Sequence, residues 1–226
     1  MEALVDVAIG DNVDLVLIAG DFFDSNRVEN NVVSFVTEQL LRLYAYVVIL
    51  AGNHDCLVAD SIYNRAEMWK EATNVRILRE PEGETLKFPG LGITVWGKPA
   101  ISYGDDGAPL DGMPPPQQDG QWHIAIAHGY FCGPGGRSWA SFQITAEEII
   151  ASGQDYIALG DSHAFTCICN EPTKAYYSGS PSYATQTVAL IELAEKTGVQ
   201  VTRYPIIIPD EGDTPPIGMP FGIDVS

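Results

Sequence analysis

Basic residues are scarce in this sequence. The 226 residues include 12 Lys and Arg against 30 Asp and Glu, which gives a formal net charge of −18. A protein that binds duplex DNA gains most of its affinity from Lys and Arg that neutralise phosphates, and here these residues are scattered rather than clustered. The composition therefore disfavours unaided, non-specific DNA binding, and we interpret the acidity as a solvated surface that keeps the protein soluble.

Long apolar runs and a cysteine framework are also missing. No stretch reaches the roughly 18 apolar residues of a membrane span, and the N-terminus has neither the basic region nor the apolar core of a signal peptide. The four cysteines lack zinc-finger spacing, so we predict buried, reduced thiols. These absences indicate a bacterial-type cytoplasmic protein that does not enter a membrane.

The first third of the chain alternates between apolar strands and helical patterns. Such alternation is typical of a parallel sheet flanked by helices. In the longer helical pattern, Val32, Val36 and Leu40 share one face, which we predict to be buried. The predicted elements are the end of a helix at 2–10, a strand at 14–19, a helix at 28–45, a strand at 46–51 and a helix at 61–72.

From residue 75 onwards the pattern changes to short strands separated by turns. A helix is predicted only after Thr145, where Thr145 and Glu148 have the spacing of a capping box. The length requires only one large domain, over 1–208, before a Pro/Gly-rich tail at 209–226. The predicted strands are 75–79, 84–88, 92–97, 122–127, 155–159, 187–193 and 199–207.

Four of the predicted strands end in Gly or Ala and are followed by side chains that can bind a metal. These side chains are Asp21, Asn53, His128 and the pair Asp161 and His163. Strand ends of an α/β sheet meet at one edge, so these residues can meet in space. A set of Asp, Asn and His without thiolates suits divalent ions such as Mn, Fe, Zn or Mg. Two ions about 3.5–4 Å apart can clamp a phosphate and acidify a bridging water.

The order and spacing of these motifs resemble those of the calcineurin-like metallophosphoesterase superfamily. The resemblance implies a four-layer α/β/β/α sandwich. A further turn, Ser178-Gly-Ser-Pro181, precedes a hydrophobic strand and is most similar to the SbcD-type DNA repair exonuclease branch. The motifs that carry the superfamily resemblance are Gly20-Asp21-Phe-Phe-Asp24, Gly52-Asn53-His54-Asp55, His128-Gly129 and Gly160-Asp161-Ser162-His163.

The resemblance also implies metal-binding roles. Asp21 matches the carboxylate that bridges two ions, and His163 matches a ligand of the first ion. Asn53 and His128 match ligands of the second ion, while Asp161 stands where that ion has a histidine ligand in the family. A carboxylate oxygen can also bind there and would favour a harder ion.

Two residues match catalytic positions that bind no metal. His54 matches the histidine that protonates the leaving group or steadies the transition state, and Asp24 matches the carboxylate that orients it. The attacking group would be a metal-bound hydroxide, without a covalent enzyme intermediate. The family's Asp-x-His motif, which holds the first ion and begins the fold on its own strand, is absent ahead of Asp21. We expect a misplaced start or a truncation at Met1 rather than a one-metal or defective site.

The sequence therefore predicts a metal-dependent phosphoesterase that hydrolyses phosphodiester bonds. One version is an SbcD-type DNA exonuclease or endonuclease that works with an SbcC-type ATPase, with Mn as the expected ion. The near alternative is a small-molecule phosphodiesterase or phosphomonoesterase, which the negative charge supports. The alternative from another class is a non-catalytic or truncated subunit that keeps only the fold.

Overall fold

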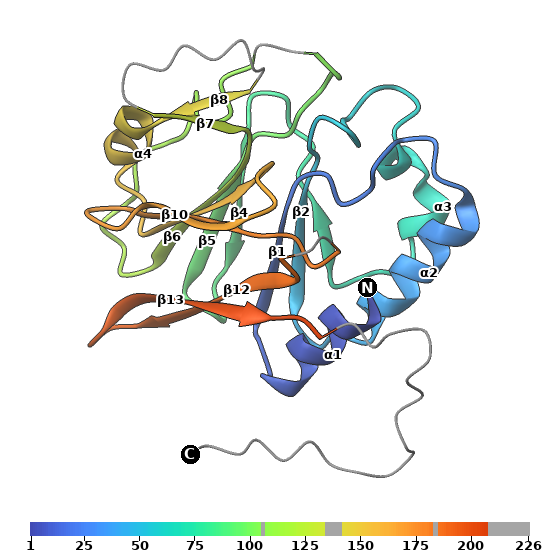
Figure 1. The fold of residues 1–226 in the computed structure, drawn as a ribbon, viewed down its shortest axis with the longest axis horizontal. Helices are drawn as coiled ribbons and strands as arrows, with labels where there is room; N and C mark the ends of the chain where they lie inside the picture. Colours follow the sequence, from blue (N-terminus) through green and yellow to red (C-terminus); the bar gives the residue numbers. More distant parts are fainter. Residues whose placement is uncertain (105–106, 134–141, 183–184, 208–226) are drawn as a thin grey trace.

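The computed structural model describes residues 1–104, 107–133, 142–182 and 185–207, which form α and β layers in the order α/β/β/α (Figure 1). The tail predicted at 209–226 lies outside these residues. The helices are α1 (Glu2–Gly10), α2 (Asn30–Leu41), the 3₁₀ turn η1 (Ile62–Asn64), α3 (Ala66–Trp69) and α4 (Ala146–Ser152). The strands are β1 (Leu15–Ala19), β2 (Tyr46–Leu50), β3 (Val75–Ile77), β4 (Glu84–Phe88), β5 (Ile93–Gly97), β6 (Trp122–His128), β7 (Tyr130–Cys132), β8 (Gln143–Thr145), β9 (Tyr156–Gly160), β10 (Phe165–Cys169), β11 (Lys174–Ser178), β12 (Thr187–Ala194) and β13 (Gly198–Pro205).

Two sheets form the middle layers. The first is the parallel sheet β1-β2-β3, which confirms the parallel pairing predicted from the strand and helix alternation. The second has the order β10-β11-β9-β6-β5-β4, with its four central strands parallel and its two outer strands antiparallel to their neighbours. The pairs β7-β8 and β12-β13 form two further small sheets.

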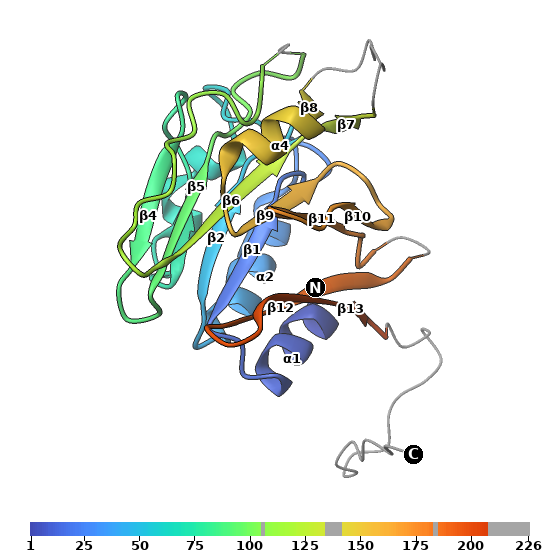
Figure 2. The ribbon, with the colours of Figure 1, turned by 90° about the vertical axis from the view of Figure 1, so that its left-hand side faces the viewer.

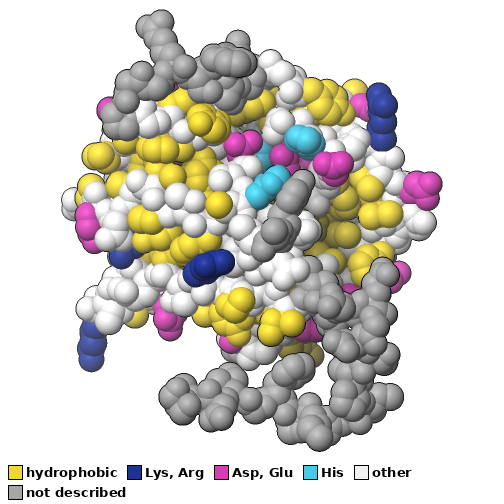
Figure 3. Space-filling model, in the orientation of Figure 1, with side chains coloured by type: hydrophobic (Ala, Val, Ile, Leu, Met, Phe, Trp, Pro, Cys, Tyr) yellow, Lys and Arg dark blue, Asp and Glu magenta, His cyan; other side chains and the backbone are white. Residues whose placement is uncertain are grey.

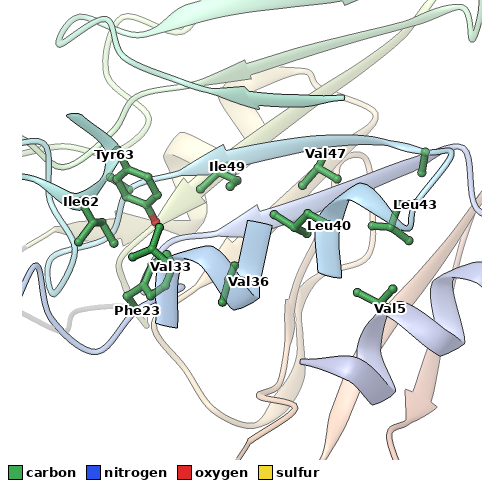
Figure 4. Close-up of a cluster of buried hydrophobic side chains, with 12 residues drawn as sticks. Val5, Phe23, Val33, Val36, Leu40, Leu43, Val47, Ile49, Ile62 and Tyr63 are labelled. Atoms are coloured by element: carbon green, nitrogen blue, oxygen red, sulfur yellow. The ribbon is translucent and has the colours of Figure 1, made fainter. Parts of the chain in front are cut away.

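Alternating side chains of β2 face two different layers. Val47 and Ile49 pack with buried residues of α1 and α2 in one apolar cluster (Figure 4). Val48 and Leu50 belong to a second cluster, which lies between the two sheets and includes residues of β5, β6 and β9. Because successive side chains of a strand point to opposite faces, a short apolar strand can be buried on both faces in this way.

The same alternation in β6 fixes the direction of its last residue. Ile124 and Ile126 face the cluster between the sheets, while Ala125 and Ala127 face the outer cluster with Ile149 of α4. His128 has the parity of Ile124 and Ile126, so its ring points towards the first sheet. The helix α4 begins at the predicted capping box, in which the Thr145 side chain accepts from the Glu148 backbone N–H.

Two of the predicted helices differ from the structure. The helix predicted over 28–45 is α2, whose buried face is Val33, Val36 and Leu40, whereas Val32 is exposed. The helix predicted over 61–72 is interrupted at Arg65, whose ψ of 73° is not helical. The guanidinium of Arg65 donates to the carbonyl oxygens of two loop residues, which holds it in this conformation. Only one turn of α-helix follows.

Four strands and two thiols also differ from the predictions. The prediction missed β7, β8, β10 and β11, and it treated all four thiols as buried. The thiols are free, but Cys167 on β10 is exposed and Cys169 is half-buried. The register of β10 against β11 shifts between these two cysteines, and such a bulge turns side chains away from regular alternation.

Strand β1 lies at the edge of the first sheet within the described part of the chain. All five of its side chains are half-buried, whereas four of the five side chains of β2 are buried. None of the helices described here is long and apolar enough to cross a membrane.

Candidate metal centre

The carboxyl ends of β1 and β2 lie beside those of β6 and β9, because the two sheets pack face to face with these strands in contact (Figures 1 and 2). The loops that follow these four strands carry the metal-capable residues identified in the sequence. Figure 3 shows histidine and acidic side chains gathered at this end of the molecule, on a surface where charged groups are otherwise spread out.

His128 is the centre of the cluster. Its Nδ1 lies 2.9 Å from the carbonyl oxygen of Ala19, which can only accept, so Nδ1 carries a proton and Nε2 is the ring nitrogen that faces the cluster. Nε2 lies 2.9 Å from Oδ1 of Asn53 and 3.2 Å from Oδ2 of Asp21. Oδ1 of Asp161 is 4.0 Å away. Metal-binding histidines are commonly fixed in this way, with the second ring nitrogen donating to a carbonyl group.

The electrostatics of the cluster favour positive charge. Burial opposes protonation of His128, but the hydrogen bond and charge of Asp21, together with the Ala19 carbonyl group and the charge of Asp161, outweigh burial and raise the pKa of the ring. Burial likewise opposes ionisation of Asp21, yet His128 and the backbone N–H of His54 lower the pKa of that carboxyl group. The site therefore stabilises a cationic species among its oxygens.

Backbone conformation at the two aspartates is strained. Asp21 has a φ of 49° and Asp161 a φ of 108°, values that favour glycine. Strain of this kind persists where surrounding structure enforces it, and it concentrates at functional sites. Two glycines make the approach of the strands possible, because a Cβ at Gly52 would overlap Asp21 and a Cβ at Gly160 would overlap the carbonyl oxygen of Ala19.

The donor set fits a hard or borderline divalent ion. Asp21 and Asn53 each lie within hydrogen-bond distance of Nε2 of His128, and Asp161 lies 4.0 Å from the same nitrogen. Across the ranges that the structure describes, no three His, Cys, Asp or Glu side chains are placed to hold an ion by themselves. The set is completed by the amide oxygen of Asn53, which is an acceptable ligand for such ions.

His163 is the remaining metal-binding residue predicted from the sequence. It lies two residues after Asp161 in an exposed loop, and its carbonyl oxygen accepts from the backbone N–H of Ser180 at 3.2 Å and the hydroxyl of Thr185 at 2.7 Å. These bonds attach the loop to the predicted turn at 178–181. The first-ion role of His163 stays a prediction.

His54 and Asp24 lie together at the edge of the cluster. Nδ1 of His54 is 3.2 Å from the carbonyl oxygen of Asp24 and 3.5 Å from its carboxylate, so both groups of Asp24 can orient the ring. The backbone N–H of His54 donates to Oδ1 of Asp21 at 2.9 Å. The side chain of His54 is 50% exposed, so a substrate can reach it.

Comparison with known proteins decides the family. The sequence profile of the calcineurin-like phosphoesterase family matches residues 1–165. The chain belongs to this family.

Individual relatives are distant from this calcineurin-like phosphoesterase. An uncharacterised metallophosphoesterase of Bacillus subtilis (strain 168), YhaO, is 28% identical over 185 residues, which are 78% of this chain and 43% of YhaO. The chain thus spans less than half the length of that relative. Among solved structures, TT1561 of Thermus thermophilus is similar with a TM-score of 0.61 and 10% identity, covering 91% of this chain and 92% of the other. This likeness shows the fold.

Asp55 lies beside this candidate site, and the sequence analysis gave it no role of its own. Its side chain is fully buried, and it accepts hydrogen bonds from the backbone N–H of Gly52 at 2.7 Å, the backbone N–H of Phe23 at 3.1 Å and the hydroxyl of Tyr63 at 2.6 Å. Burial raises the pKa of Asp55 despite these three donors. The sequence did hold one indication of this role, since Asp55 directly follows the Asn53-His54 pair and had been assigned no other function.

Proposed function

We propose that this chain hydrolyses phosphodiester bonds with a divalent ion held by Asp21, Asn53 and His128, assisted by Asp161. Mn is the ion we favour, and Fe, Zn or Mg would suit the same ligands. The observation that supports the proposal is the convergence of Asn53 and Asp21 on Nε2 of His128, while Nδ1 is bonded to Ala19, so that a metal ion would replace the proton on Nε2. When bound, such an ion supplies positive charge against the phosphate and makes a water molecule more acidic.

His54 would serve the leaving group. A half-exposed imidazole next to the cluster can donate a proton to an oxygen that departs from phosphorus. With Nδ1 directed at Asp24, the other ring nitrogen is the atom that would meet the leaving group. Asp21 holds the backbone of His54 in place through its N–H, so metal binding and ring position are linked through one carboxylate.

A DNA nuclease of the SbcD type, working with an SbcC-type ATPase, is a second candidate. The turn at 178–181, which resembles that branch, is bonded through Ser180 to the carbonyl group of His163, so it borders the site. The net charge of −18 weighs against it, because binding of duplex DNA needs basic residues near the phosphates. We therefore place a small phosphodiester substrate first.

The experiment is hydrolysis of bis-p-nitrophenyl phosphate and of p-nitrophenyl phosphate with added Mn²⁺. We expect faster turnover of the diester, and a loss of at least about 100-fold in Asp21→Asn. Faster turnover of the monoester would indicate a phosphomonoesterase. Absence of hydrolysis of both esters at saturating metal would support a non-catalytic subunit and contradict the proposal.

A further inference from the structure

A cavity of about 480 Å³ opens next to the pair His54 and Asp24, and no step proposed above uses it. Three loops line it, those after β1, β2 and β5. Ser25 follows Asp24 directly, and Val58 is four residues beyond His54. We refer to this cavity as the Tyr103 pocket, and its lining residues are Ser25, Arg27, Val58, Asp60 and Tyr103.

The walls of the Tyr103 pocket are held by a buried amide. The side chain of Asn26, only 4% exposed, donates to the hydroxyl oxygen of Tyr103 at 3.1 Å and to the carbonyl oxygen of Cys56 at 2.9 Å. Its own oxygen accepts from the backbone N–H of Ile62 at 3.0 Å. Arg65 holds the same loop by donating to the carbonyl oxygen of Asn26 at 2.7 Å. One residue therefore connects all three loops before a ligand arrives.

Tyr103 presents its ring rather than its hydroxyl. The hydroxyl is bonded to Asn26, while the residue as a whole is 56% exposed. An aromatic ring that is fixed at its polar end and remains exposed to solvent can serve as a stacking platform for a base.

The remaining groups of the pocket are polar and of opposite charge. Arg27 can donate to acceptors of a heterocycle or to a phosphate, and Asp60 can accept from ring or exocyclic N–H groups. Ser25 is already engaged, since its hydroxyl accepts from the backbone N–H of Arg27 at 3.1 Å. A stacking ring together with one donor and one acceptor side chain is the combination that recognises a nucleobase.

The volume indicates how much of a substrate fits. About 480 Å³ lies within the range of small-molecule sites, and a site of this size holds a nucleoside, not a length of duplex. The position next to His54 assigns the occupant to the leaving-group side of the scissile bond, because His54 is the residue that would protonate the leaving oxygen.

We propose that the Tyr103 pocket binds the nucleobase of a nucleoside leaving group, so that the substrates are small nucleotide phosphodiesters. The inference rests on the proposed phosphodiesterase function and adds the substrate class. Tyr103 stacks on the base, Asp60 and Arg27 bind its edge, and the ribose extends towards His54.

Binding is tested without turnover. Guanosine and adenosine are titrated into the full chain, with ribose as the ring-free control, and the amide resonances are followed by NMR. Both nucleosides should shift the signals of Val58, Asp60 and Tyr103, and ribose should not. Tyr103→Ala should weaken binding at least about fivefold, while Tyr103→Phe, which keeps the ring, should bind within about twofold of wild type. Nucleosides that leave these signals unchanged, or that bind Tyr103→Ala as tightly as wild type, overturn the inference.

Kinetics then separates the two proposals. On a dinucleoside monophosphate, Tyr103→Ala should raise KM by about tenfold with little change in kcat, since stacking is retained from the bound state to the transition state. If bis-p-nitrophenyl phosphate is hydrolysed but Tyr103→Ala has wild-type constants on the dinucleotide, only the pocket inference fails. If nucleosides bind but no ester is hydrolysed, the phosphodiesterase proposal fails and the binding site stands.

Discussion

The Asp55 carboxylate connects the loop after β2 to the loop after β1, because its Oδ2 accepts the backbone N–H of Phe23 at 3.1 Å. Its Oδ1 accepts the backbone N–H of Gly52, the residue before Asn53. A single buried side chain therefore sets the distance between the loop of Asp21 and the loop of Asn53. The positions of the proposed metal ligands therefore depend on Asp55, although its carboxylate bonds to the backbone of neighbouring residues instead.

Removing this carboxylate should destabilise the fold. Asp55→Ala leaves two buried N–H groups and the hydroxyl of Tyr63 without their acceptor, and each unsatisfied group costs about 1–3 kcal/mol. We expect a loss of at least about 3 kcal/mol in the free energy of unfolding by urea. Asp60→Ala, which removes an exposed carboxylate from the same loop, should change it by no more than about 0.5 kcal/mol. Equal effects of both variants would contradict the role of Asp55.

Metal affinity should distinguish the two histidines at opposite ends of β6. His128→Ala removes the nitrogen that faces Asp21 and Asn53, so Mn²⁺ binding measured by titration calorimetry should weaken at least about tenfold. His123→Gln is the matched control, because His123 is bonded to Thr94 and Asp119 instead. We expect it to bind Mn²⁺ like wild type. Retention of full affinity in His128→Ala would exclude it as a ligand.

The effect of replacing His54 should depend on the leaving group. A nucleoside leaves as an alkoxide, which needs a proton, whereas p-nitrophenolate is a stable leaving group without one. His54→Ala should therefore lower kcat on a dinucleoside monophosphate by about 10²–10⁴-fold and on bis-p-nitrophenyl phosphate much less. An equal loss on both substrates, with Mn²⁺ affinity unchanged, would show that His54 does not donate the proton.

The free energy of unfolding should depend on pH through the Asp119 carboxyl group. The backbone N–H of Gln121, followed by His123, holds the pKa of this carboxyl group below its ordinary value. A lowered pKa means that the folded chain binds the proton less readily than the unfolded chain. The stabilisation by Asp119 is therefore present above the ordinary carboxyl pKa and is lost as the pH falls through the lowered value.

The comparison is between wild type and Asp119→Asn, with urea unfolding measured from neutral pH to strongly acidic pH. Asp119→Asn should be the less stable protein at neutral pH, and the two curves should meet in acid. A difference that persists unchanged at the lowest pH would assign the stabilisation to something other than the charge.

The sequence predicted that the strands before Asn53 and His128 end at one edge of a sheet, because both are short and mainly apolar and each is followed by a metal-capable side chain. The structure adds that both strands are largely buried. The end of β6 shows why His128 points inward, since it shares the parity of Ile124 and Ile126. Such arguments depend only on local spacing.

The features that the sequence did not predict depend on contacts between residues far apart in the chain. Strand β10 lacks regular alternation of buried side chains, and its register against β11 shifts between Cys167 and Cys169, so no period marks it. The break at Arg65 follows from bonds to a loop more than 35 residues earlier in the chain. The role of Asn26 could not be found either, because its partners lie on two other loops, those after β2 and β5.

Asp21 and Asp161 have positive φ values, which glycine adopts without strain. Selection for heat resistance alone would therefore favour glycine at these positions, and it would remove the oxygens that face His128. Thermostable descendants of this protein would be expected to lose the chemistry before they lose the fold.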